Sequence, residues 1–184
     1  MTWRSRKAMV AVAVGAVLAT TTTGSTASAD DNGKPGVQNT LHEELTGYEE
    51  TPVALSTTGS GRFRVKIDEA HQQVSYQLSY AGLEGTVTQA HIHFGAIAQS
   101  GGISVFLCSN LGNGPAGTQA CPAPPAAITG TITPADIIGP AGQGITAGQF
   151  SEVIGAIRAG KMYANVHSTL YPAGEIRAQI GHNH

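Results

Sequence analysis

The sequence predicts an all-β fold, an antiparallel sandwich or Greek-key barrel with one or two short helices. Short stretches of alternating apolar and polar residues recur about seven to nine times, separated by turns rich in Gly, Pro, Asn or Asp at intervals of about 8–12 residues. Helical spacing of apolar residues is confined mainly to one stretch after residue 145. The strands therefore do not alternate with helices, as strands do around a parallel sheet.

The N-terminal segment has the pattern of a secretory signal peptide. Basic residues precede an apolar run at 8–19, and Ala27-Ser28-Ala29 offers the small residues of a cleavage site. The apolar run is short and rich in Ala, which makes a membrane anchor the weaker alternative. We therefore expect a secreted, extracellular protein. The predicted organisation is a signal peptide at 1–29, a mobile leader at 30–40, one domain at 41–181 and a tail at 182–184.

The charge of the mature chain limits its partners. After cleavage the chain would keep seven basic and twelve acidic residues, a net charge of −5 with neutral histidine. A mildly acidic surface repels phosphate backbones and anionic lipids. We expect an extracellular partner, with neither nucleic acid nor a membrane as the binding surface.

The two cysteines, Cys108 and Cys121, are the only ones in the chain. In an exported protein such a pair predicts a disulfide, and this one would close a loop rich in Gly, Asn and Pro. Two free thiols that bind a metal are the alternative.

The strands are predicted in order from their alternation. In residues 62–67 apolar Phe63, Val65 and Ile67 alternate with basic side chains, and a second alternating run at 74–80 follows a short polar turn. This arrangement indicates a β-hairpin. The other expected strands are 37–45, 88–94, 103–107, 127–132, 161–167 and 174–180.

Two short helices are expected in the second half of the chain. Thr133-Pro134 is a helix-start signal, and residues 146–159 place apolar side chains at helical spacing before Gly160. The longer helix is expected to cap the barrel. In the last strand, the alternation predicts that Glu175, Arg177 and Gln179 face outward.

Three histidines form the candidate functional site. His91 and His93 stand two apart in a predicted strand, so both leave the face that carries Ala90 and Ile92. The same alternation places His167 on the polar face of a later strand. Neutral imidazoles suit Cu(II) and Zn(II), and such binding should weaken below the usual histidine pKa of about 6.5. The alternative is that the three rings only hydrogen-bond loops and fix strand ends.

Several motifs of the chain resemble the CHRD domain family, named after the repeats of chordin. The similarity covers residues 41–180 and implies an immunoglobulin-like β-barrel in secreted proteins, with the two histidine strands close together. The one departure is Ala178, where the family usually has Gly. The motifs are Leu45-Thr46-Gly47, Glu50-Thr51-Pro52-Val53, Ala90-His91-Ile92-His93, Val166-His167-Ser168 and 174–180.

The layout is also similar, at a distance, to the Cu,Zn superoxide dismutase barrel. That resemblance implies that His91, His93 and His167 match its copper ligands. The loop that would hold zinc is missing, and no histidine lies between His93 and His167 to bridge two metals. Dismutase activity is therefore not expected. The chain also lacks the Gly-x-Ser-x-Gly motif, and Ser168 points away from its neighbour His167 on a strand.

Two functions from different classes follow from these observations. The first is a secreted metal-binding module, with copper or zinc in the three-histidine cluster and Glu175 as a possible orienting acid. The second is a non-catalytic extracellular interaction or structural domain without metal. His182 and His184 in the tail are alternative ligands if the cluster is not the site.

Overall fold

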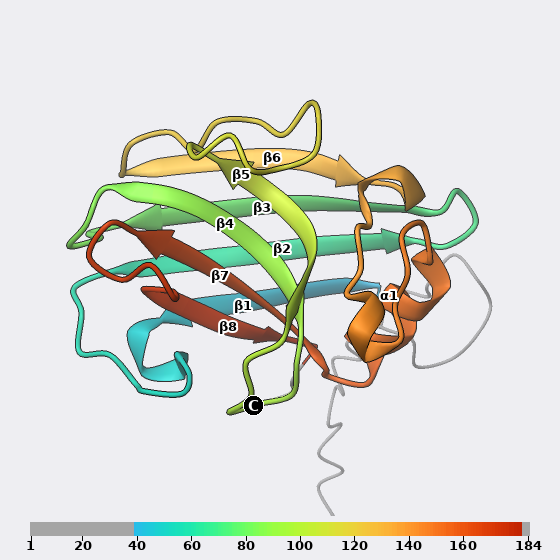
Figure 1. Cartoon of the computed structure of the whole chain (residues 1–184), viewed down its shortest axis with the longest axis horizontal. Coiled ribbons are helices and arrows are strands. Elements are labelled where there is room, and N and C mark those ends of the chain that lie inside the picture. The colour runs from blue at the N-terminus through green and yellow to red at the C-terminus, as the bar shows by residue number, and fades with distance from the viewer. Residues whose placement is uncertain (1–38, 182–184) are drawn as a thin grey trace, which may run out of the picture. The chain divides into compact units, whose positions relative to one another are not determined.

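Eight antiparallel strands form one sheet in the computed structural model, which describes residues 39–181 (Figure 1). Their order is β5-β4-β7-β8-β1-β2-β3-β6, and the sheet curls into a nearly closed barrel. The predicted all-β class is confirmed. The strands are β1 (Thr40–Thr46), β2 (Ser60–Asp68), β3 (Gln73–Ala81), β4 (Val87–Phe94), β5 (Gly102–Ser109), β6 (Ala126–Ile132), β7 (Met162–Ser168) and β8 (Ile176–Ile180).

The predicted segments at the two ends of the chain fall largely outside these residues. The signal peptide at 1–29 and the tail at 182–184 lie entirely outside the described range, and the leader at 30–40 lies outside it up to residue 38. Within the described range, no helix is long and apolar enough to cross a bilayer.

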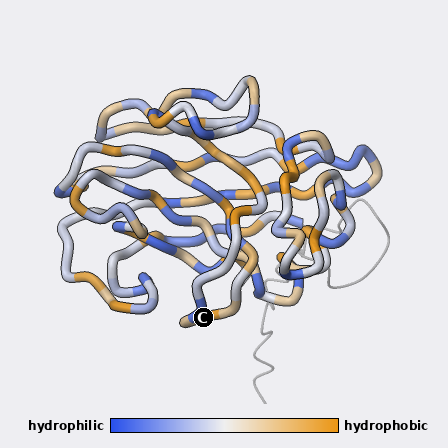
Figure 2. Tube along the Cα trace, in the orientation of Figure 1, coloured by the Kyte–Doolittle hydropathy of each residue, from blue (hydrophilic) through white to orange (hydrophobic). Residues whose placement is uncertain are grey.

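The alternation of apolar and polar residues determines the pairing of β2 and β3. Phe63 lies opposite Leu78 and Val65 opposite Tyr76, so the apolar side chains of both strands share one face. The predicted hairpin is therefore present. Figure 2 shows the alternating hydropathy along these strands. The side chains on the inner face form the barrel core, in which Leu45, Leu78 and Ile92 have at most 1% exposure.

Helices are short and lie between strands. The 3-10 turns are η1 (Gly47–Glu49), η2 (Pro134–Asp136) and η3 (Ala141–Gln143), and the α-helix is α1 (Phe150–Arg158). Figure 1 shows α1 at one end of the barrel, where it buries Phe150, Val153, Ile154 and Ile157. The helix was expected from residue 146. It starts later because Gly148 has a φ of 82° and the Thr146 N–H bonds the Gln149 side chain, which makes this stretch a turn.

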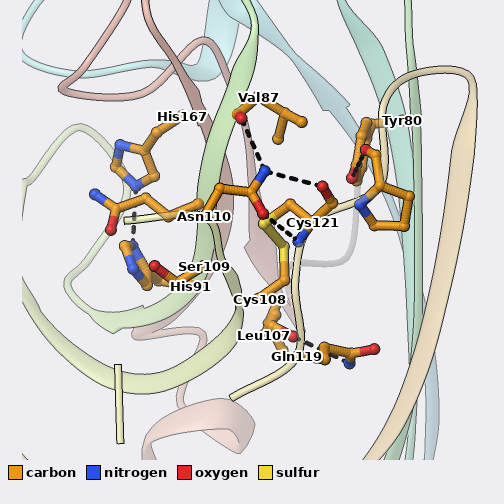
Figure 3. Close-up of a disulfide and its surroundings, with 12 residues drawn as sticks. Tyr80, Val87, His91, Leu107, Cys108, Ser109, Asn110, Gln119, Cys121 and His167 are labelled. Atoms are coloured by element: carbon orange, nitrogen blue, oxygen red, sulfur yellow. Dashed lines mark hydrogen bonds between the residues drawn. A yellow bond between two sulfur atoms is a disulfide. The ribbon is translucent and has the colours of Figure 1, made fainter. Parts of the chain in front are cut away.

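The Gln119 side chain bridges the edge strands β5 and β6, and a disulfide ties the loop between them to β5 (Figure 3). The Gln119 amide donates to Leu107 O of β5 at 3.1 Å and to Thr129 O of β6 at 3.3 Å. Cys108, at the end of β5, is bonded to Cys121 as expected, and Asn110 holds the backbone of Cys121 through two hydrogen bonds. The loop between the edges is therefore fastened at several points.

The outer face of β4, β7 and β8 carries a second buried layer, which is polar. Glu175, Arg177 and Gln179 do leave the core side as predicted, yet their side chains are at most 5% exposed. On these strands, a side chain that faces away from the core is therefore still shielded from solvent. Three segments cover this polar layer, approximately residues 50–59, 95–101 and 169–174. They form hydrogen bonds with the side chains of the layer, as donors or as acceptors.

Candidate metal centre

His91, His93 and His167 meet in this polar layer. His91 and His93 come from β4, and His167 comes from the neighbouring strand β7, where it pairs in register with Gln89. One ring nitrogen from each histidine lies within 4.8 Å of the others. The three histidine residues, His91, His93 and His167, are 0%, 7% and 5% exposed, respectively. The structure thus brings together the three residues that the sequence singled out, at a buried position.

Backbone carbonyls determine the tautomers of two of the rings. Nδ1 of His93 lies 3.0 Å from the Gly101 carbonyl, and Nδ1 of His167 lies 3.0 Å from the Pro172 carbonyl. A carbonyl only accepts, so each Nδ1 must carry the proton. Nε2 of both rings is therefore a lone-pair nitrogen in the neutral state.

The tautomer of His91 follows from that of His167. Nδ1 of His91 lies 3.0 Å from Nε2 of His167, as the dashed line in Figure 3 shows. Because that Nε2 is an acceptor, His91 donates through Nδ1. Nε2 of His91 and Nε2 of His93 are both buried and have no hydrogen-bond partner within residues 39–181. Two lone pairs thus remain unsatisfied next to the His167 ring.

Burial keeps all three imidazoles neutral. Desolvation, with the neighbouring rings of His167 and His93, lowers the pKa of His91 to about 2. Desolvation and His93 lower the pKa of His167 to about 4. The pKa of His93 is also lowered, chiefly by burial. The usual histidine pKa therefore does not apply here, and the cluster keeps its lone pairs well below neutral pH.

Arg177 and Tyr163 fasten the loop that covers His93. The His93 ring stacks on Tyr163 with centroids 4.8 Å apart, and the Arg177 guanidinium lies 3.5 Å from the centre of the same Tyr163 ring. Arg177 also donates to the carbonyls of Ala96 and Gln99. This loop is therefore attached to β7 and β8. The His93 ring lies between the Tyr163 ring and the Gly101 carbonyl.

Glu175 occupies a different place from the one expected. Its Oε1 accepts hydrogen bonds from the Thr57 hydroxyl at 2.8 Å and the Glu84 N–H at 2.6 Å, so the carboxylate holds two loops. Carbonyl groups, and not this acid, orient the rings of His93 and His167. The buried acid that sequence reasoning missed is Glu50, whose only signal was its place in the Glu50-Thr51-Pro52-Val53 motif.

Fold and site together define a β-barrel protein with a buried three-histidine cluster. The model of the CHRD domain matches residues 41–180, and the chain belongs to this family. Neither the search of curated proteins nor the search of solved structures finds a match.

Proposed function

We propose that this CHRD-domain protein is exported and binds one copper or zinc ion through His91, His93 and His167. The observation that carries the proposal is that three buried histidines bring one ring nitrogen each within 4.8 Å of one another, with Nε2 of His93 left without a hydrogen-bond partner among the described residues. A buried acceptor left without a partner costs about 1–3 kcal/mol, so such atoms are rare in proteins unless a ligand or water uses them.

A purely structural role explains only the hydrogen bonds that the Nδ1 atoms of the histidine rings make. The Nδ1 atoms of His93 and His167 hold the loops at Gly101 and Pro172, which agrees with that alternative. It gives no reason for ring nitrogens of three buried histidines to lie within 4.8 Å of one another. A histidine that ligates a metal commonly donates a hydrogen bond from its other ring nitrogen to a carbonyl, because this bond fixes the tautomer and the direction of the lone pair. The same contacts therefore support the metal reading.

The chemistry of the donor set favours copper or zinc. Three neutral imidazoles suit these ions, and a three-ligand site leaves a coordination position open. The histidines supply lone pairs, the carbonyls of Gly101 and Pro172 orient two of the rings, and the covering loops exclude water. His91 would bind through Nδ1 as its other neutral tautomer, with the proton on Nε2, so that Nδ1 of His91 and Nε2 of His167 could both act as ligands.

Export is supported by two features of the chain. The N-terminal segment has the three parts of a secretory signal. The Cys108–Cys121 disulfide belongs to an oxidising compartment. The intact mass of the secreted protein tests export, since a mature chain would begin at Asp30.

The metal site is tested with His93→Asn in protein purified without a histidine tag. The Asn amide can still donate to the Gly101 carbonyl, but the variant has no Nε2 lone pair. We expect wild type to bind one Zn(II) or Cu(II) in calorimetric titration and His93→Asn to lose at least about tenfold in affinity. The control is His42→Asn on β1, where the histidine is exposed. Equal binding by His93→Asn and wild type would exclude this site. Absence of binding in wild type would leave the interaction domain as the function.

A further inference from the structure

Glu50 is a buried carboxyl group close to Gly174 and Asn165. It follows η1 and is 6% exposed, and its Oε1 has no hydrogen-bond partner. The group comes close to β7 because residue 174 is glycine. A Cβ at Gly174 would lie 2.5 Å from Oε1 of Glu50 and 2.7 Å from Nδ2 of Asn165. Glu50 and Asn165 therefore face the same small space.

Asn165 connects this carboxyl group with the histidines. It lies two residues before His167 on β7 and pairs in register with His91 on β4. The Asn165 side chain lowers the pKa of Glu50 and raises the pKa of His93, so it interacts with both groups. Four buried polar atoms without partners follow this path, on Glu50, Asn165, His91 and His93. The unsatisfied atoms thus extend from the cluster to the carboxyl group.

The charges around the cluster require a negative group when a divalent ion is present. The three histidines are neutral, and Arg177 already places a positive charge near His93, whose pKa it lowers. The positive charge of Arg177 also lowers the pKa of Glu50, against the effect of burial. On Glu175, another buried acid of this face, Oε1 accepts hydrogen bonds from the Thr57 hydroxyl and the Glu84 N–H, and Oε2 has no partner among the described residues. A dication in a low-dielectric site costs several kcal/mol unless an anion compensates it.

We propose that Glu50 determines the charge preference of the metal site: through Asn165, its carboxylate compensates a divalent ion and favours Zn(II) and Cu(II) over Cu(I). This inference rests on the proposed metal function. Glu50 is a positioning and specificity residue, because its carboxylate acts through Asn165 and not as a ligand. Burial raises its pKa to about 7, so the negative charge is available close to neutral pH.

The test compares two metals of different charge in Glu50→Gln. The substitution keeps the shape of the side chain and removes the charge. At pH 7.5, competition with chelators should show Zn(II) affinity reduced by at least about tenfold and Cu(I) affinity changed by less than about threefold. A structural disturbance would reduce both affinities together. Glu50→Asp, which keeps the charge, should restore part of the Zn(II) affinity. Glu49→Gln, at the exposed neighbouring acid, is the matched control.

The results separate the two proposals. If wild type binds Zn(II), His93→Asn does not, and Glu50→Gln binds both metals as wild type does, the metal site stands and the role of Glu50 is wrong. A parallel loss of Zn(II) and Cu(I) in Glu50→Gln also overturns that role. If wild type binds neither metal, the proposed function itself fails. Should Glu50→Gln not fold, Glu50→Asp alone decides: Zn(II) affinity must stay within about tenfold of wild type, and a larger loss contradicts the inference.

Discussion

Nδ1 of His91 donates a hydrogen bond to Nε2 of His167 over 3.0 Å, and this contact determines the protonation of the whole cluster. Because the Pro172 carbonyl fixes the His167 tautomer, the proton between the two rings belongs to His91. The metal-free protein thus has a proton at the place where two ligand atoms converge. Because the buried rings stay neutral, they should contribute less to stability at acidic pH.

The contribution of His167 to the stability of the metal-free protein should fall as the pH drops below about 6.5. The unfolded chain protonates its histidines near that pH, whereas burial holds the folded pKa of His167 at about 4. Protons therefore bind the unfolded state first, and stability falls through the window from about 6.5 to 4. One such site contributes at most about 1.4 kcal/mol per pH unit. Urea denaturation at several pH values in the presence of a chelator measures the effect.

His167→Asn isolates this contribution. The variant keeps a donor for the Pro172 carbonyl but deprives His91 of its acceptor, so it should be less stable than wild type at pH 7.5. The difference should shrink by about 2–3 kcal/mol between pH 6.5 and 4.5, because the variant no longer carries this titrating group. His42→Asn should track wild type at every pH. A difference that stays constant with pH would contradict the assignment of a neutral, buried His167.

Gly174 should tolerate no side chain. Its φ of 135° is unfavourable for other residues, and a Cβ would lie 2.5 Å from the Glu50 carboxylate. Gly174→Ala should therefore lower the free energy of unfolding by at least about 2 kcal/mol. Gly142→Ala, which has no heavy atom within 4 Å of the added Cβ, should change it by less than about 0.5 kcal/mol. Similar effects of the two substitutions in thermal denaturation would show that the space beside Glu50 is not restricted.

Alternation was sufficient to predict the strands and the face on which each histidine lies, whereas the family resemblance implied that the two histidine strands are close together. His91, His93 and His167 had to share one side of their strands, because Ala90, Ile92 and Val166 needed the core. The burial of that side could not be predicted in the same way. It depends on loops that are remote in sequence, and alternation distinguishes the two faces of a strand without showing what covers the second one.

Glu50 illustrates the same limit. It lies 115 residues before Asn165 in sequence, and no local pattern indicates that its carboxyl group enters the polar layer. The family motif marked the segment but gave this acid no role. The contact exists because η1 turns the chain toward β8 and because Gly174 leaves room for the carboxylate. Such contacts follow from the tertiary arrangement.

Removing the Cys108–Cys121 disulfide or the Gln119 hydrogen bonds should weaken the attachment of the loop between β5 and β6 and destabilise the barrel. A disulfide that closes a loop of this length contributes about 3 kcal/mol in the chain-entropy model. Cys108→Ala with Cys121→Ala should therefore lower the free energy of unfolding by about 2–4 kcal/mol in urea titrations. Gln119→Ala, which removes the bridge between Leu107 and Thr129, should cost about 1–2 kcal/mol. An unchanged urea midpoint in both variants would mean that the barrel edges need neither fastening.

Glu50 should make the metal-free protein less stable as the pH rises. The unfolded carboxyl group ionises near pH 4.5, but burial raises its folded pKa to about 7, so above pH 4.5 folding requires a proton that the unfolded chain has released. The resulting loss of stability grows between pH 4.5 and about 7 and reaches about 3 kcal/mol. Glu50→Gln carries no such penalty, and its stability relative to wild type should rise across this window and then level off. Glu49→Gln should show no comparable rise. If the relative stability of Glu50→Gln were the same at pH 5 and pH 8, the carboxyl group would not be held in a desolvated state, and the charge that the metal site is proposed to use would have to come from elsewhere.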